Sequence, residues 1–260
     1  MLLDYHTHSF YSFDGEAPLE QMAAAACRRG LREICCTDHL DFDMPVHHIP
    51  DFTARQEEIC RLEQQHPDLI LRRGAEVSLR DVDCARSASA VLSGADLDFV
   101  LGSLHTIDGI DVWDAPYYAG KTKQEAYRQY LEAAAGILPT FPQMNVLAHY
   151  DFVAKYAPYP DRTMTLEDAP DAFDTIFRWL IAGGRGLEIN TASWQADASW
   201  GQDILRRYRE LGGEYVTLGS DTHGTERLGA RIPEAQELAK QAGIPWIATF
   251  FRGTPEFHRL

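Results

Sequence analysis

The chain has 260 residues, of which 45% are hydrophobic and 24% are charged, and its net charge at pH 7 is −15. This composition is typical of a soluble globular protein, and the length suits one large domain of about 250 residues. Because phosphate backbones are bound by basic surfaces, and no cluster of lysine and arginine interrupts this acidic sequence, a nucleic-acid partner is excluded.

The sequence also predicts a compartment. No apolar run approaches the roughly 18 residues that a membrane span requires. The first predicted strand begins at residue 2, which leaves no room for a signal peptide. The five cysteines include no C-x-x-C pair, which favours reduced thiols. We therefore predict a cytoplasmic protein without a membrane partner, and we leave open whether it is a monomer or a homodimer.

Strands and helices are predicted to alternate along the whole chain. Apolar runs predict strands at 2–5, 33–37, 69–75, 98–102, 144–148, 186–190 and 215–219, and the apolar segment 244–251 can be an eighth strand. Helices are predicted at 18–29, 52–65, 83–92, 122–135, 170–182 and 201–211, with a last one from Pro233 to near Gly243. Thr122 and Glu125 form a capping-box signature. No linker, repeat or low-complexity tract divides the chain, so we predict one domain over residues 1–260 with a parallel sheet.

Histidines and carboxylates gather where the predicted strands end. His6 and His8 follow the first strand, and because residues i and i+2 of an extended chain point to the same side, both can contact one ion. A single pair of this kind can also be two polar residues at a strand end, but the pattern recurs along the chain. The further candidates are Asp14, His39, Glu76, His105, His149, Asp221 and His223.

The distribution of these candidates predicts the architecture. A doubly wound open sheet collects its ligands at one switch point. Here the candidates follow six different strands, and only a closed or nearly closed barrel brings six strand ends around one pocket, at its C-terminal face. We therefore predict an α/β barrel with a single site.

Nine imidazole and carboxylate ligands exceed the three or four that one Zn²⁺ takes, so they suit two or three ions, with Glu76 bridging two of them. Mixed nitrogen and oxygen ligation fits Zn, Mn or Fe better than Mg or Ca. A water shared between such ions becomes a nucleophile near neutral pH. The chain has neither a G-x-S-x-G nor a G-x-x-x-x-G-K-[ST] motif. We predict metal-dependent hydrolysis and no organic cofactor.

These motifs resemble a known family. His6-Thr7-His8, Thr37-Asp38-His39, Glu76, His105, His149 and Ser220-Asp221-Thr222-His223 are similar, in order and over essentially the whole chain, to the motifs of the PHP (polymerase and histidinol phosphatase) superfamily. The resemblance implies a distorted TIM-like (β/α)7 barrel with a trinuclear metal site at the C-terminal face of the strands.

Carried over position by position, the resemblance implies three ions. The first is held by His6, His8, Glu76 and Asp221, the second by Glu76, His105 and His149, and the third by Asp14, His39 and His223. Many relatives have histidine at the position of Asp14, and an alternative role for Asp14 is to cap the helix at 18–29. Glu76, Asp221, His223 and Asp14 are the expected catalytic residues, and His223, Asp14 or a metal-bound water can protonate the leaving group.

A finer resemblance is to the bacterial histidinol-phosphate phosphatases, through the segments 99–105, 149–156, 188–191 and 219–223. It implies hydrolysis of L-histidinol phosphate to L-histidinol and phosphate through a metal-bridging hydroxide, in histidine biosynthesis. Two alternatives stay open. The first is a PHP phosphoesterase for another phosphomonoester or phosphodiester, such as a nucleotide or phosphotyrosine, and the second is a barrel that retains metals without turnover.

A phosphorylated substrate needs cationic partners at the mouth of the barrel. Arg162 and Arg252 are the predicted substrate-binding residues, because arginine matches phosphate bidentately, although each can instead form a surface ion pair. Lys121, Lys155 and Arg227 are weaker candidates. Trp113, Trp194 and Trp200 can wall the pocket around an imidazole ring, or simply pack the loops.

Overall fold

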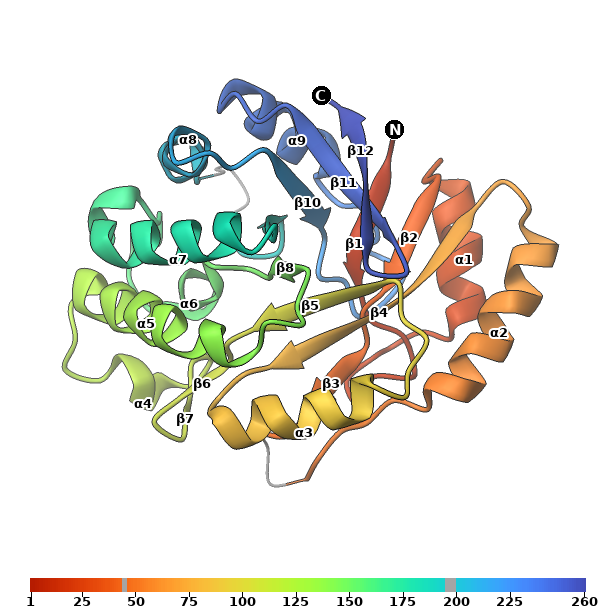
Figure 1. The fold of residues 1–260 in the computed structure, drawn as a ribbon, viewed down its shortest axis with the longest axis horizontal. Helices are drawn as coiled ribbons and strands as arrows, with labels where there is room; N and C mark the ends of the chain where they lie inside the picture. The colour runs from red at the N-terminus through yellow and green to blue at the C-terminus, as the bar shows by residue number, and fades with distance from the viewer. Residues whose placement is uncertain (44–45, 195–199) are drawn as a thin grey trace.

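The computed structural model describes residues 1–43, 46–194 and 200–260. It is a mixed α/β fold in which helices pack around a curved sheet (Figure 1). In the described ranges the sheet contains β1 (Leu3–Thr7), β2 (Glu33–Cys36), β4 (Ile70–Ser78), β5 (Phe99–Ser103), β8 (Val146–Leu147), β9 (Gly186–Asn190), β10 (Tyr215–Gly219), β11 (Trp246–Phe251) and β12 (Thr254–Arg259), in that order, with β3 (His39–Asp41) beside β4. Neighbours are parallel from β1 to β11, and β12 is antiparallel to β11.

Seven of the described helices agree closely with the predicted ones, whereas the short helices α4 (Ala115–Tyr118) and α6 (Phe152–Tyr156) were not predicted. The seven are α1 (Leu19–Arg28), α2 (Phe52–Gln65), α3 (Val82–Leu92), α5 (Lys123–Ile137), α7 (Pro170–Ala182), α8 (Gln202–Glu210) and α9 (Ile232–Gln241). The capping box of α5 is confirmed, because the Thr122 side chain accepts from the backbone of Glu125 and the Glu125 side chain accepts from that of Thr122. A short hairpin, β6 (Thr106–Ile107) and β7 (Ile110–Asp111), and two 3₁₀ turns (Leu138–Thr140 and Leu166–Asp168) complete the set.

Three strand predictions need correction. The segment 244–251 does join the sheet as β11, but it continues into a hairpin with β12, which was not predicted. The short strand β3 was also missed. Because β3 pairs with the last part of β4, that strand extends to Ser78, and Glu76 lies within it rather than after it.

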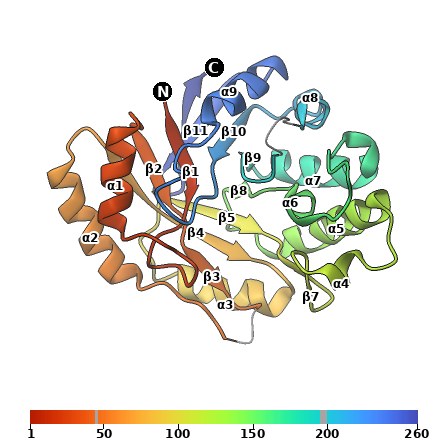
Figure 2. The same cartoon turned by 180° about the vertical axis from the view of Figure 1, so that it is seen from behind.

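The sheet curves so that its first strand meets the segment after β10. The backbone N–H of His8 donates to the carbonyl of Thr222 (2.8 Å), and the N–H of Asp221 donates to the carbonyl of His6 (2.9 Å). The buried carboxylate of Asp4 accepts from the N–H of Ser220 (2.9 Å). Both ends of the chain lie close together in the two opposite views (Figures 1 and 2). The C-terminal end of β1 is thereby placed beside the residues that follow β10.

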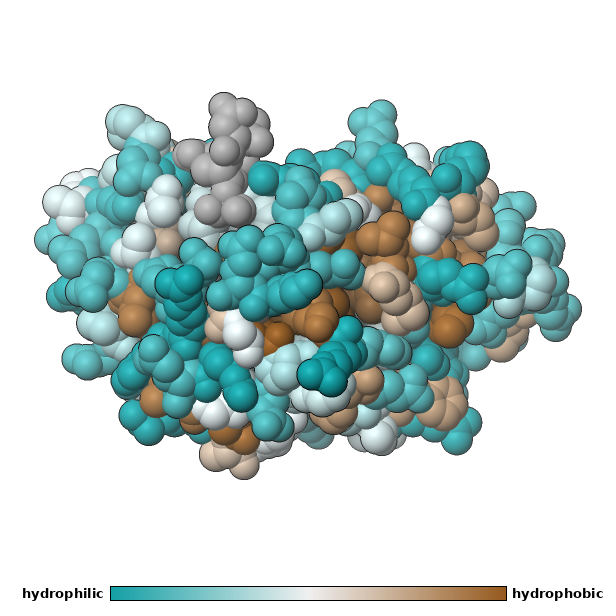
Figure 3. Space-filling model, turned by 90° about the horizontal axis from the view of Figure 1, so that it is seen from above, coloured by the Kyte–Doolittle hydropathy of each residue, from teal (hydrophilic) through white to brown (hydrophobic). Residues whose placement is uncertain are grey.

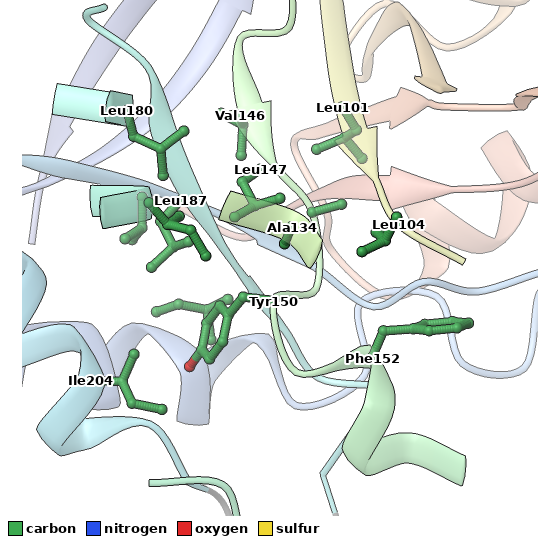
Figure 4. Close-up of a cluster of buried hydrophobic side chains, with 14 of the residues drawn as sticks. Leu101, Leu104, Ala134, Val146, Leu147, Tyr150, Phe152, Leu180, Leu187 and Ile204 are labelled. Atoms are coloured by element: carbon green, nitrogen blue, oxygen red, sulfur yellow. The ribbon is translucent and has the colours of Figure 1, made fainter. Parts of the chain in front are cut away.

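The core fills the space between the sheet and its helices. β1, β9 and β10 are buried along their whole length, as expected for parallel strands covered on both faces. In Figure 4, Leu187 from β9 and Leu180 from α7 lie in one cluster with Tyr150 and Ile204, and Phe152 stands at its edge. Seen from above, the surface is mainly hydrophilic, with a band of hydrophobic residues across its middle (Figure 3). Among the described helices, none combines the length and apolar character needed to cross a membrane.

Candidate metal centre

A single carboxylate lies at the centre of the predicted ligands. Glu76 is 1% exposed on β4, and five imidazoles surround it. The distances from its carboxylate oxygens are 2.8 Å to His149 Nε2, 3.2 Å to His6 Nε2, 3.3 Å to His105 Nε2, 3.3 Å to His39 Nδ1 and 3.5 Å to His8 Nε2. Strands β1, β3 and β4 and the segments after β5 and β8 deliver these side chains to one place.

The described residues form four groups whose ligand atoms lie within 4.8 Å of one another. These are His8, Asp14, His39 and His223; His6, His8 and Asp221; His6, Glu76 and His149; and His39, Asp41 and His105. All nine predicted ligands are therefore brought together. The grouping differs in detail from the one that the family resemblance implies, because His8 also joins the set with Asp14, and Asp41 joins His39 and His105.

Asp14 belongs to this cluster rather than to helix α1. Its Oδ2 lies 3.1 Å from His223 Nε2 and 3.6 Å from His39 Nε2. The N-cap of α1 is Pro18, and no side chain caps that helix. The alternative role of Asp14 as a helix cap is therefore wrong.

Outer contacts orient the histidines of β1. His6 Nδ1 lies 2.8 Å from Glu188 Oε1, and His8 Nδ1 lies 3.1 Å from the hydroxyl of Ser12. In both rings this leaves Nε2 facing Asp221 and Glu76. A carboxylate that accepts from one ring nitrogen fixes the tautomer, so that the other nitrogen can bind a metal ion.

The electrostatics of the cluster favour cations. Burial would raise the pKa of Glu76, but the neighbouring His6, His39 and His105 lower it well below its usual value. Burial would lower the pKa of His39, but Asp41 and Glu76 raise it to about 10. Burial, assisted by the charge of His39, lowers the pKa of His8 to about 4, towards the neutral form in which a histidine binds metal.

The donor set fits divalent metal ions. The described residues offer no hydrogen-bond partner to three buried atoms of the cluster, His8 Nε2, His39 Nδ1 and Asp14 Oδ1. Buried polar atoms are normally satisfied, so unpaired lone pairs in a group of imidazoles and carboxylates indicate a ligand. Nitrogen and oxygen donors of this kind suit zinc, manganese or iron.

The cluster forms one wall of a pocket of about 360 Å³. The lining residues are Phe13, Asp14, His39, Asp41, Asp43, Glu76, His105, Trp113, His149, Phe152, Lys155, Tyr156, Asp221 and His223. Lys155 Nζ lies 2.9 Å from Asp221 Oδ2, and the lysine side chain is 23% exposed. Lys155, a weaker candidate in the sequence, is therefore the cation that the fold brings to the pocket.

The two predicted arginines lie elsewhere. Arg252 occupies the turn between β11 and β12, where its backbone N–H donates to Asp98, just before β5. That position is at the opposite end of β5 from His105, so the prediction that Arg252 binds substrate is wrong. Arg162 lies closer, since its guanidinium donates to the backbone oxygen of Lys155 (2.7 Å), but it does not line the pocket.

Of the three tryptophans, only Trp113 lines the pocket. Trp200 is buried and donates to Asp151 (2.7 Å), and the guanidinium of Arg231 lies over the ring of Trp194. Trp194 and Trp200 therefore pack the loops, which was the alternative interpretation of these residues.

Sequence reasoning gave no site role to Asp41, Asp43 or Glu188. Asp41 follows His39 by two residues, so their shared face on a strand was a usable signal. Glu188 lies on a predicted strand, but nothing local connects it with His6, which is 182 residues away.

The chain is similar to known proteins over nearly its whole length. The sequence profile of the PHP domain matches residues 4–192. The chain is 34% identical to a histidinol-phosphatase of Lactococcus lactis, over 95% of this chain and 94% of that protein. It is 28% identical to a probable histidinol-phosphatase of Thermotoga maritima, with 95% of each chain covered. A crystal structure of histidinol phosphate phosphatase from Lactococcus lactis, complexed with zinc, L-histidinol and phosphate, superposes with a TM-score of 0.90 at 32% identity and 98% coverage of both chains.

Proposed function

Because the chain belongs to the PHP domain family, we propose that it is a metal-dependent phosphatase that hydrolyses L-histidinol phosphate to L-histidinol and phosphate. The observation that carries the chemistry is Glu76, a buried carboxylate with five imidazoles within 3.5 Å. The similarity to the Lactococcus lactis phosphatase, whose structure holds zinc, L-histidinol and phosphate, supports the substrate.

We further propose that two or three ions bind here. His6, His8, Glu76 and Asp221 would hold one, Glu76, His105 and His149 a second, and Asp14, His39 and His223 a third. When bound, such ions polarise the phosphoryl group and supply a nucleophilic water.

The residues around the ions complete the chemistry. Glu188 holds the tautomer of His6 (2.8 Å), and Lys155 offers a cation to the phosphoryl oxygens from its place beside Asp221. Asp14 and His223, 3.1 Å apart, are partly exposed at the pocket, where they would hold the third ion. If only two ions bind, we assign to His223 the delivery of a proton to the leaving oxygen.

The fold supports a finer architectural proposal. Seven parallel strands, β1, β2, β4, β5, β8, β9 and β10, are consecutive neighbours, and a bridge from Thr7 to Thr222 joins the first strand to the segment after the last. We propose a distorted (β/α)7 barrel that forms one domain over residues 1–260, with the ions at the C-terminal ends of the strands. Asp221 and His223 lie beyond the matched residues 4–192, so the proposed site also includes the segment after β10.

The test is phosphate release from L-histidinol phosphate by protein loaded with Zn²⁺ or Mn²⁺, compared with p-nitrophenyl phosphate, a nucleotide, phosphotyrosine and bis-p-nitrophenyl phosphate. We expect kcat/KM to be highest for L-histidinol phosphate. A better substrate among the others, with L-histidinol phosphate left intact, would move the function to another phosphoester. No turnover of any phosphoester after full loading would indicate a barrel that holds metals without catalysis.

A further inference from the structure

The pocket contains a carboxylate that the metal cluster leaves unused. Asp43 lines the pocket with Asp41, His105 and Trp113, and it is 8% exposed. Its Oδ2 accepts from the hydroxyl of Ser78 (2.5 Å) and, at 3.4 Å, from that of Thr106. Its Oδ1 is buried and has no hydrogen-bond partner within the described residues.

Asp43 differs from the other carboxylates of this pocket. Each of the other four lies near a cationic or imidazole side chain, as in Asp14 with His223 (3.1 Å), Asp41 with His39 (3.3 Å), Glu76 with His149 (2.8 Å) and Asp221 with Lys155 (2.9 Å). Asp43 has no such partner within 4.0 Å among the described residues; Arg80 donates to its backbone oxygen instead, while pairing with Asp81. A buried carboxylate without a counter-charge is unfavourable, and a cationic ligand group would relieve it.

The hydrogen bonds of Asp43 also hold it in one orientation. Ser78, which ends β4, fixes the Oδ2 side of the carboxylate. Thr106, directly after His105, lies 3.4 Å from the same oxygen, although its hydroxyl is closer to Asp111 (2.9 Å). The opposite oxygen is left for a ligand. Trp113 also lines the pocket, with its ring 6.3 Å from that of His105, and offers an aromatic face to an imidazole.

We propose that Asp43 is a specificity residue that binds the ammonium group of an aminated phosphomonoester through its free Oδ1. The inference rests on the proposed function, because L-histidinol phosphate carries a phosphoryl group, a primary ammonium and an imidazole. Lys155 and the ions receive the phosphoryl group, and Asp43 receives the ammonium. Phosphomonoesters without an amine lose this contact.

The experiment compares L-histidinol phosphate with 3-(imidazol-4-yl)propyl phosphate, which keeps the ring and the phosphate but lacks the amine. Asp43→Asn retains an acceptor for Ser78 and removes the charge. We expect KM for L-histidinol phosphate to rise at least about tenfold, which corresponds to about 1.4 kcal/mol. KM for the amine-free substrate and the metal content by elemental analysis should stay unchanged. Asp111→Asn is the matched control, because Asp111 also accepts from Thr106 (2.9 Å) but does not line the pocket.

Three results with the Asp43 variant would overturn the inference. Equal losses for both substrates would mean a structural role, a fall in metal content would make Asp43 a ligand, and unchanged kinetics would place the ammonium elsewhere. If Asp43→Asn does not fold, Asp43→Ser gives the same comparison. Wild-type protein that cleaves both substrates equally well would refute ammonium recognition but not phosphatase activity, whereas wild-type protein that cleaves neither would refute the proposed function as well.

Discussion

Replacing Glu188 by glutamine tests whether the outer contacts of the metal site set its affinity. Glu188 is fully buried on β9. Its Oε1 lies 2.8 Å from His6 Nδ1, and its Oε2 accepts from the backbone N–H of His149 (2.7 Å) and the amide of Asn190 (3.1 Å). The carboxylate therefore accepts on both sides, and it connects the first strand with the segment after β8.

Glutamine can satisfy only one of these sides. If its oxygen faces His6, its NH₂ group meets the N–H of His149; if its NH₂ group faces His6, the imidazole must shift its proton to Nε2, the atom needed for the ion. Either arrangement loses a hydrogen bond to a charged group, worth about 1.5–3 kcal/mol. At about 1.4 kcal/mol per factor of ten, ion binding should weaken about 10–100-fold.

The assay is a Zn²⁺ titration of metal-free protein against a competing chelator, with activity followed in parallel. Glu33→Gln is the control, because Glu33 is also a buried strand carboxylate with two donors, Tyr5 (2.5 Å) and Arg72 (2.6 Å), but it lies at the N-terminal end of β2. We expect Glu33→Gln to destabilise the fold without changing zinc affinity. Equal zinc affinity for Glu188→Gln and wild type would refute the proposed role of Glu188.

Four further outcomes are expected. Glu76→Gln should lower the metal content and reduce kcat/KM by more than about 100-fold, because Glu76 is proposed to bind two ions directly, whereas Glu188 contacts only a ligand. Full metal content by elemental analysis would contradict this. Lys155→Met should raise KM for a phosphomonoester about tenfold, while Arg252→Met leaves the kinetics unchanged, and equal effects would remove Lys155 from the site. Chelation should abolish phosphate release and lower the melting temperature, with Zn²⁺ or Mn²⁺ restoring both, and an unchanged melting temperature would argue against buried ions. Burial would raise the pKa of Asp98, but hydrogen bonds from Arg73 lower it overall below 3.8. The ion pair of Asp98 with Arg73 therefore stabilises the fold above pH 3.8, and this stabilisation is lost as the pH falls through the pKa of Asp98 in the folded protein. In urea unfolding, the stability difference between wild type and Asp98→Asn should therefore shrink between pH 5 and pH 2, and a constant difference would refute the assignment.

Much of this fold could be predicted because its signals are local. Apolar runs separated by helical periodicity gave the parallel strands and long helices, and the capping box of Thr122 and Glu125 marked a helix start correctly. The missed strands of the sheet, β3 and β12, are short or exposed, and such strands have no strong pattern of their own; the short elements α4, α6, β6 and β7 were missed as well. β3 and β12 form because a neighbouring strand offers unpaired backbone groups.

Most candidate ligands were also visible in the sequence, because the carboxyl ends of parallel strands meet at one edge and every ligand except Asp14 lies at or near such an end. The cationic side chain that lines the pocket could not be predicted in this way. Arg252 and Lys155 both follow apolar segments, yet Arg252 sits in an antiparallel hairpin that returns to the start of β5, whereas Lys155 lies on α6, which places it beside Asp221. The direction that the chain takes after each apolar segment determines whether the cation reaches the pocket, and no local sequence pattern specifies that direction.

Residue spacing within single elements was enough to predict the succession of strands and helices and the types of side chain in the candidate site, because these signals are local. Contacts between distant segments determine which side chains complete the site. Glu188 reaches His6 across 182 residues, and Ser78, 35 residues from Asp43, donates to one oxygen of that carboxylate. These contacts depend on the curvature of the sheet and on burial, which arise only when distant segments pack together.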